Sequence, residues 1–195
     1  MKIGCVILAS GMSKRFGSNK LLCDFRGKPM MVQILRSIKQ AGIRPSVAVT
    51  RHPEIAQLCE AEGIPAILHE LPLRSDTVRL GTEHLLEVCP ELDGILFAAS
   101  DQPCLKWESI AALCGGLAAE PDCIHRLSFE GTAGNPVLFP RWAFGELCRL
   151  PEGKGGGAVI KAHPERVRMV EASDARELID VDTPEVLQQL LQTAI

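Results

Sequence analysis

A short basic segment follows the first apolar run of the chain. Residues 9–28 carry one carboxylate, Asp24, whereas the whole chain of 195 residues has a formal charge of −3. The cations of this segment are Lys14, Arg15, Lys20, Arg26 and Lys28. Glycine lets backbone N–H groups approach an anion closely, and cationic side chains neutralise its charge. The composition of the segment therefore favours binding of a phosphate group.

Two common phosphate-binding motifs are absent from this segment. A P-loop requires G-x-x-x-x-G-K-[S/T], but five residues separate Gly11 from Gly17 and no G-K-[S/T] follows. The dinucleotide fingerprint G-x-G-x-x-G is also missing. On charge alone, an exposed basic loop without a ligand remains the alternative interpretation.

Strand patterns and helix patterns alternate along the chain. Apolar runs with β-branched residues predict strands at 3–9, 46–50, 66–69, 93–99 and 167–170, and two more within 123–139 around Gly131. Amphipathic stretches predict helices that begin at Pro29, at Pro53, after an N-cap at Ser75, near 109, 141 and 155, and at Pro184. This alternation predicts one α/β domain over residues 1–195, with three layers and a mostly parallel, Rossmann-like sheet. A small antiparallel element is expected near 123–139.

Asp101 follows the predicted strand at 93–99 almost directly. Ligands of an open parallel sheet bind at the carboxyl ends of its strands, so Asp101 and the basic segment are expected at the same edge. Mg²⁺ prefers one or two carboxylates together with phosphate and water oxygens. Asp101 is therefore a candidate Mg²⁺ ligand, and a turn-forming aspartate before Gln102 and Pro103 is the alternative.

Read as a whole, residues 8–20 (LASGMSKRFGSNK) resemble the L-A-A-G-x-S-x-R-x-G-x-x-K signature of the MobA-like nucleotidyltransferases. The segment is most similar to the branch that attaches CMP or GMP to the molybdenum cofactor. Residues 21–29 continue the pattern, and further family motifs are matched by residues 77–81 (TVRLG), 99–105 (ASDQPCL), 134–139 (GNPVLF) and 178–185 (LIDVDTPE). The resemblance implies the nucleotide-diphospho-sugar transferase type of α/β fold.

The resemblance also implies a reaction. It is the Mg²⁺-dependent transfer of CMP from CTP to molybdopterin-type molybdenum cofactor, with release of pyrophosphate. A molybdenum hydroxylase apoenzyme is a further candidate partner. One alternative is the use of GTP or another NTP on a different phosphate acceptor, such as a sugar phosphate. A second is a non-catalytic accessory protein that binds the molybdenum cofactor for a molybdenum hydroxylase, against which the intact Arg15, Lys20 and Asp101 argue.

Site residues follow from the resemblance as well. The nucleotide is expected on Leu8, Ala9, Ser10, Gly11, Arg15, Lys20, Ser75, Thr77 and Arg79. Lys20, Arg15 and Asp101 are the expected catalytic residues, because charge that develops on the phosphates must be neutralised. Arg79 is equally well explained as a solvated charge.

Two assignments are less determined by the sequence. Asp180 is preferred over Asp182 as a second metal ligand, because Asp182-Thr183-Pro184 is a favourable helix start. Asn135 and Lys154 are the candidates for binding the acceptor. Residues 153–157 (GKGGG) depart from the G-D-x-G-x-R that the family often has, and this leaves the acceptor open.

Composition excludes several other classes of protein. A charge of −3 and a pI of about 6.0 argue against a nucleic-acid binder. The apolar run at the N-terminus has only seven residues, so we expect a buried strand, no membrane span and a cytoplasmic protein. The eight cysteines form no C-x-x-C pair, which favours reduced thiols that pack in the core.

Overall fold

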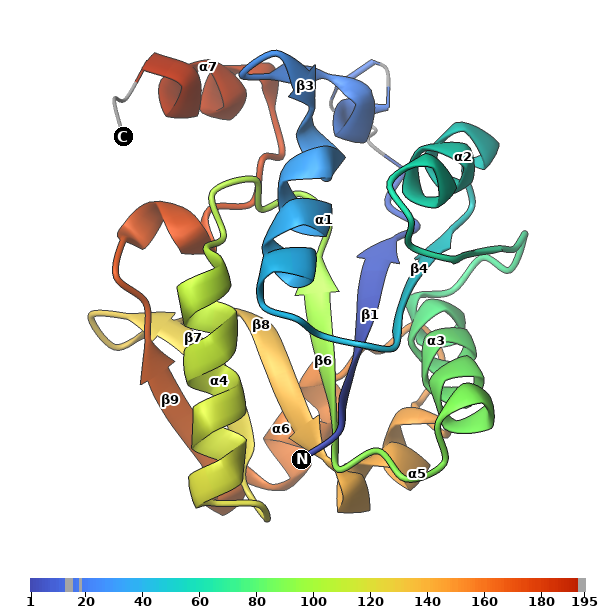
Figure 1. Cartoon of the computed structure of the whole chain (residues 1–195), viewed down its shortest axis with the longest axis vertical. Helices are drawn as coiled ribbons and strands as arrows, with labels where there is room; N and C mark the ends of the chain where they lie inside the picture. Colours follow the sequence, from blue (N-terminus) through green and yellow to red (C-terminus); the bar gives the residue numbers. More distant parts are fainter. Residues whose placement is uncertain (13–15, 18, 193–195) are drawn as a thin grey trace.

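Seven strands of the chain form one twisted sheet in the computed structural model, which describes residues 1–12, 16–17 and 19–192 (Figure 1). The strand order is β5-β4-β1-β6-β8-β7-β9. The strands are β1 (Ile3–Ala9), β4 (Ser46–Thr50), β5 (Ala66–Leu68), β6 (Gly94–Ala99), β7 (Ile124–Phe129), β8 (Thr132–Pro140) and β9 (Val167–Glu171). A separate small antiparallel sheet pairs β2 (Asp24–Phe25) with β3 (Lys28–Pro29).

The large sheet is mostly parallel. β1 pairs in parallel with both β4 and β6, and β4 pairs in parallel with β5. β8 is antiparallel to its neighbours β6 and β7, whereas β9 is parallel to β7. The predicted α/β class is confirmed, and so is the predicted antiparallel element near 123–139.

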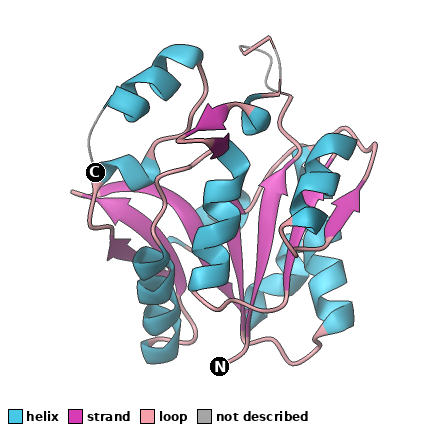
Figure 2. Cartoon of the chain, turned by 45° about the horizontal axis from the view of Figure 1, so that its top comes forward, coloured by secondary structure: helices cyan, strands magenta, loops and turns pink. Residues whose placement is uncertain are grey.

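Helices cover both faces of the sheet (Figures 1 and 2). They are α1 (Met30–Gln40), α2 (Pro53–Ala61), α3 (Arg74–Val88), α4 (Trp107–Ala119), α5 (Phe144–Leu147), α6 (Gly157–Ala162) and α7 (Pro184–Gln192), with short 3₁₀ turns η1 (Lys20–Leu22), η2 (Arg141–Ala143), η3 (Pro164–Arg166) and η4 (Ala175–Leu178). One apolar core contains residues of α1, α2 and α4, and the other contains residues of α3, α5 and α6. No helix in the described ranges is both long and apolar enough to cross a lipid bilayer.

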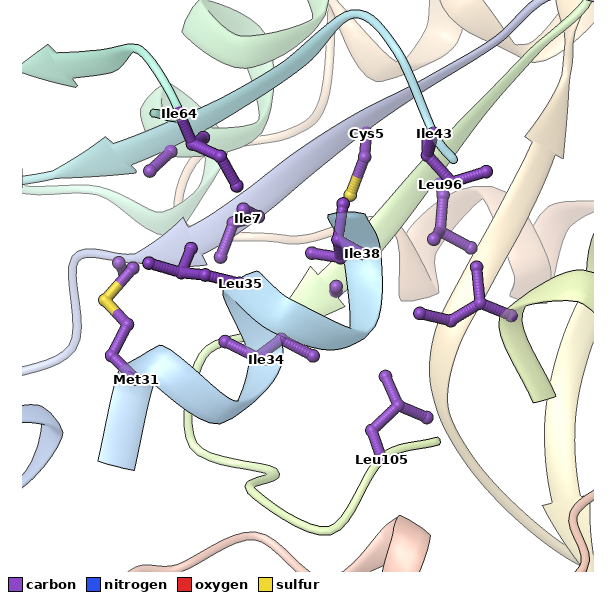
Figure 3. Close-up of a cluster of buried hydrophobic side chains, with 14 of the residues drawn as sticks. Cys5, Ile7, Met31, Ile34, Leu35, Ile38, Ile43, Ile64, Leu96 and Leu105 are labelled. Carbon is purple, nitrogen blue, oxygen red and sulfur yellow. The ribbon is translucent and has the colours of Figure 1, made fainter. Parts of the chain in front are cut away.

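Helix α1 illustrates how the sequence pattern builds the first core. Its residues Ile34, Leu35 and Ile38 recur at helical spacing and are fully or almost fully buried. They pack against Cys5 and Ile7, which lie on the same face of β1 because alternate strand residues share a face (Figure 3). Burial of each such side chain is worth about 1.5–3 kcal/mol, so this contact holds α1 firmly against β1.

The cysteines are free thiols, and three of them are buried. Burial raises the pKa of the Cys59 thiol to about 12, followed by a smaller effect of the Glu60 charge. Burial likewise raises the pKa of Cys5, next to α1. These two thiols therefore stay protonated near neutral pH and act as small apolar side chains, as the sequence predicts.

The start of α3 differs from the prediction. The helix begins at Arg74, and the Asp76 side chain accepts a hydrogen bond from the Leu73 backbone N–H at 3.2 Å. The Ser75 hydroxyl lies inside the first turn and accepts a hydrogen bond from the backbone N–H of Gly153 at 3.2 Å. The prediction that Ser75 is the N-cap was wrong, because a contact with a distant loop uses the hydroxyl that a cap would need.

Two helical glycines allow a matched test of the packing. A Cβ at Gly81 of α3 would lie 2.5 Å from Val6 Cγ1 of β1, whereas a Cβ at Gly115 of α4 would meet nothing within 4 Å. Alanine is favoured over glycine in a helix by about 1 kcal/mol, but overpacking costs about 1–3 kcal/mol. We expect Gly81→Ala to lower the free energy of unfolding in urea and Gly115→Ala to raise it. Equal gains for both variants would contradict close packing of α3 on β1.

Candidate active site

A cavity of about 560 Å³ lies at the carboxyl ends of β1, β4 and β6. This edge of the sheet is at the top of Figure 1 and faces forward in Figure 2. We call it the first cavity; its wall consists of Leu8, Ser10, Gly11, Met12, Lys20, Leu21, Arg51, Pro72, Leu73, Arg74, Thr77, Ala99, Ser100, Asp101, Asn135 and Asp182. The structure thus brings the loop after β1 and Asp101 together, as the parallel sheet requires.

Lys20 and two carboxylates form the polar centre of this cavity. The Lys20 side chain donates hydrogen bonds to Asp101 Oδ2 at 2.7 Å and to Asp182 Oδ1 at 2.9 Å. Only 8% of Lys20 is exposed. Burial by itself lowers the pKa of the Lys20 ammonium, but the hydrogen bonds and charges of Asp101 and then Asp182 outweigh it and raise that pKa above its ordinary value. Lys20 therefore carries a positive charge at neutral pH.

Local hydrogen bonds hold the members of this cluster in place. The Asn19 side chain accepts a hydrogen bond from the Leu21 N–H at 3.2 Å and so begins the turn η1 that carries Lys20. The backbone N–H of Val181 donates a hydrogen bond to the Asp101 carbonyl at 2.9 Å. This bond joins the segment after β6, which carries Asp101, to the segment before α7, which carries Asp182. The hydroxyl of Thr183 accepts from the Val186 N–H at 3.4 Å in the first turn of α7.

The structure gives Asp182 a different contact from the one that the sequence favours. Capping was the preferred role of Asp182, but Thr183 makes the capping hydrogen bond, and the Asp182 carboxylate contacts Lys20 instead. Burial raises the pKa of Asp180, with smaller contributions from the charges of Asp101 and Asp182. The Asp180 residue is nevertheless exposed at the surface and does not line the first cavity, and its role as a metal ligand remains a prediction.

The donor set fits a divalent cation of the Mg²⁺ type. Asp101 and Asp182 already converge on one positive charge, the Lys20 ammonium. Within the part of the chain that the structure describes, no group of three or more His, Cys, Asp or Glu side chains could enclose a metal ion. A cation bound here would therefore draw its remaining ligands from phosphate and water oxygens, which is how Mg²⁺ binds at many phosphate-transfer sites.

A second cavity of about 880 Å³ adjoins the first and shares Leu8, Arg74 and Asn135 with it. Its cationic wall residues are Arg74, Arg126, Lys154 and Lys161, and its apolar ones include Val78, Phe97, Val137, Phe139 and Ile160. No Asp or Glu of the described residues lines it. A cavity with this wall attracts an anion that also has an apolar surface.

Most of the predicted nucleotide residues lie at the first cavity, but not all. Its wall includes Leu8, Ser10, Gly11, Lys20 and Thr77. The Ala9 side chain is fully buried behind the wall, and Arg15 lies outside the described residues.

Ser75 and Arg79 are not among the wall residues of either cavity. Arg79 donates to Glu83 at 3.0 Å and to Asp76 at 3.5 Å, which are its neighbours on α3. Nucleotide binding by Arg79 therefore gains no support from the geometry. Asn135 lines both cavities, and Lys154 lines the second, so the two candidate acceptor residues lie at the same cavity.

Three arginines at the two cavities were not identified from the sequence. Arg51 and Arg74 line the first cavity, and Arg126 lines the second. Arg51 directly follows the predicted strand at 46–50, so the rule that ligands bind at the carboxyl ends of strands would have selected it. Arg126 lies inside β7, where no sequence pattern indicates a cavity.

Comparison with known proteins finds several relatives of the chain. Over 201 residues it is 28% identical to the purine catabolism protein PucB of Bacillus subtilis, which covers 92% of this chain and 91% of PucB. It is 34% identical over 122 residues to the bifunctional protein GlmU of Syntrophomonas wolfei, and 31% identical over 124 residues to a 3-deoxy-manno-octulosonate cytidylyltransferase of Acidovorax sp.. These matches cover 58% and 61% of the chain, but only 25% and 44% of the two relatives.

Solved structures share the fold. The Rv0371c protein of Mycobacterium tuberculosis superposes over the whole of both chains with a TM-score of 0.84 and 26% identity. A nucleotidyl transferase of Methanothermobacter thermautotrophicus covers 97% of this chain and 95% of its own, with a TM-score of 0.80 and 19% identity. A complex of Rv0371c with manganese is also similar, with a TM-score of 0.75 and 24% identity over the whole of both chains.

A family model agrees with these similarities. The model of the MobA-like NTP transferase domain matches residues 5–167, which include most of β1, Lys20, Asp101 and the described wall residues of both cavities except for Asp182. This match covers most of the chain. The protein therefore belongs to the family of MobA-like NTP transferase domains.

Proposed function

We propose that this chain transfers CMP from CTP to molybdopterin-type molybdenum cofactor and releases pyrophosphate. The observation that carries the proposal is the pair of adjoining cavities. The first contains the loop after β1 and the cluster of Lys20, Asp101 and Asp182, and the second has a cationic and apolar wall. Two substrates bound in these cavities would meet near Leu8 and Asn135, which both cavities share.

The proposed reaction is a displacement at phosphorus. A phosphate oxygen of the acceptor forms a bond to the α-phosphorus of CTP, and the bond from this phosphorus to the oxygen of the β-phosphate breaks. Pyrophosphate leaves with the electron pair of that bond. Negative charge grows on the phosphate oxygens during the step, so catalysis depends on orientation and positive charge and needs no nucleophilic side chain.

The roles of the polar residues follow from this chemistry. Lys20, with Arg15 as a further proposed contact, would neutralise charge on the phosphates, because both side chains remain cationic. Asp101 and Asp182 would hold the Mg²⁺ ion, which when bound supplies further positive charge to the phosphate oxygens. Lys20 contacts both carboxylates in this structure, so nucleotide phosphates and carboxylates compete for its ammonium group.

The wall of the second cavity supports an anionic acceptor with a ring or another apolar part. Arg74, Arg126 and Lys154 offer positive charge without a facing carboxylate among the described wall residues, and apolar side chains such as Phe97 and Ile160 complete the wall. The phosphate and the ring system of a molybdopterin-type cofactor combine these two properties.

A second candidate is the same transfer to a different phosphate or sugar-type acceptor. The chain is similar to a protein named 3-deoxy-manno-octulosonate cytidylyltransferase, and residues 153–157 depart from the pattern that the resemblance predicts. Such an acceptor would use the same cationic groups of the second cavity. The nucleotide cavity and its chemistry are the same in both candidates.

Thermal unfolding with nucleotides tests the donor substrate. A ligand that binds only the native state raises the melting temperature, and a concentration of 100 times its Kd adds about 2.7 kcal/mol of stability. We expect CTP with Mg²⁺ to raise the melting temperature more than GTP, ATP or UTP does. A larger shift with another NTP would transfer the proposal to that nucleotide, and no shift with any of the four would contradict nucleotidyl transfer.

Substitution of Lys20 tests the catalytic cluster. We expect Lys20→Ala to reduce the rate of pyrophosphate release by about 10²-fold or more, because it removes charge stabilisation in the transition state. Nucleotide affinity should fall much less, since the interaction is strongest in the transition state. The control is Lys39→Ala, which removes an exposed lysine paired with Glu62. A near-normal rate in Lys20→Ala would overturn the assignment.

Direct binding of Mn²⁺ in the absence of nucleotide tests the cation site. Lys20→Ala leaves Asp101 and Asp182 without their shared ammonium, so Mn²⁺ should bind this variant more tightly than the wild type. Asp182→Asn should weaken Mn²⁺ binding more than Asp180→Asn does. The opposite order would return the ligand role to Asp180.

A further inference from the structure

Three consecutive side chains at the end of β4 donate hydrogen bonds to three consecutive carbonyls, that of the last residue of β1 and the next two of the loop after it. Thr50 Oγ1 donates to the Ala9 carbonyl at 2.9 Å. Arg51 donates to the Ser10 carbonyl through Nη2 at 2.8 Å and Nε at 3.2 Å. His52 Nε2 lies 2.9 Å from the Gly11 carbonyl, and because a carbonyl only accepts, this nitrogen must carry a hydrogen.

This arrangement determines the direction of the loop amides. A trans peptide is planar, so the N–H that follows each carbonyl points the opposite way. The carbonyls of residues 9–11 point toward the end of β4, and the N–H groups of residues 10–12 therefore point away from it. Ser10, Gly11 and Met12 all line the first cavity. Successive N–H groups that face a cavity form a concave site for an anion.

The same segment also holds the other end of the loop. Glu54, in the first turn of α2, accepts a hydrogen bond from Asn19 Nδ2 at 3.0 Å. Asn19 Oδ1 in turn accepts from the Leu21 N–H at 3.2 Å, in the turn that carries Lys20. The His52 ring lies 4.0 Å from the Glu54 carboxylate, so the two contacts belong to one local network.

We infer that the segment from Thr50 to Glu54, called here the β4–α2 segment, is a positioning device that fixes both ends of the nucleotide loop before the nucleotide binds. The inference rests on the proposed function. A loop fixed at both ends loses less conformational freedom when the ligand arrives, so more of the contact energy appears as affinity. His52 and Glu54 do not line the first cavity, whereas Arg51 does. The effect of His52 and Glu54 on the substrate is therefore indirect.

Glu54 provides the sharper test because its side chain is exposed at the surface. Glu54→Ala removes the acceptor for Asn19, and we expect the Kd and the KM for CTP with Mg²⁺ to rise about tenfold, as for loss of one hydrogen bond to a charged group. The melting temperature of the nucleotide-free protein should change by less than about 2 °C, because surface substitutions cost little stability. Glu54→Gln retains an acceptor oxygen and should restore most of the affinity.

His52 gives an independent measurement with the same design. His52→Leu removes the donor to the Gly11 carbonyl and should also raise the Kd for CTP, whereas His52→Gln can still donate through its amide group. The matched control is Gln57→Ala, an exposed change on the outer side of α2. In every variant kcat should change less than KM, because these residues act on binding through the loop.

The outcomes separate this inference from the proposed function. If wild type binds CTP, and Glu54→Ala and His52→Leu bind it equally well, the positioning role is overturned and the proposed function stands. A lower melting temperature with unchanged nucleotide affinity also overturns it, because it indicates a purely structural role. If wild type binds none of the four NTPs, the proposed function fails and this inference fails with it.

Discussion

A buried ammonium group shared by two carboxylates is the interaction on which this edge of the molecule depends. Lys20 is separated from Asp101 by 81 positions and from Asp182 by 162. The Lys20 side chain is buried, whereas those of Asp101 and Asp182 are 22% and 43% exposed, so it is the ammonium charge that most needs its partners. The turn η1, the end of β6 and the segment before α7 therefore have to stay together. Residues of all three line the first cavity.

The sheet explains why these groups can meet. β1, β4 and β6 are neighbouring parallel strands, so the segments after them emerge on the same side. The antiparallel strand β8 runs beside β6 and carries Asn135 to the boundary between the two cavities. One topological feature thus places the first cavity, whose wall has mixed charge, beside a second cavity whose described wall contains cations and no carboxylate. This separation of charge suits a reaction between two anionic substrates.

Sequence patterns could predict the frame and part of the site. The strand at 3–9 and the carboxylate after the strand at 93–99 are local signals, and the parallel topology is enough to bring Lys20 and Asp101 to one edge. The choice between Asp180 and Asp182 was beyond the sequence. Both lie in an irregular segment without a helical or strand period that would decide which side chain faces Lys20.

The wrong prediction for Ser75 came from a contact that is distant in the chain. Ser75 has the residue type of an N-cap, but its hydroxyl contacts Gly153, 78 positions away. No local pattern contains that information. The hydrogen bonds from the β4–α2 segment to the carbonyls of residues 9–11 are equally non-local, and they become visible only when β1 and β4 are paired in register.

The most direct test of the central claim follows the α-phosphate itself. CTP labelled at the α-phosphorus is incubated with the protein, Mg²⁺ and molybdopterin-type cofactor, and both products are measured. Our account predicts that the label moves from CTP to the cofactor in a one-to-one ratio with released pyrophosphate. Pyrophosphate release without label on the cofactor would contradict the proposed acceptor. The absence of both products, from every NTP and with a sugar phosphate as well, would contradict nucleotidyl transfer at this site.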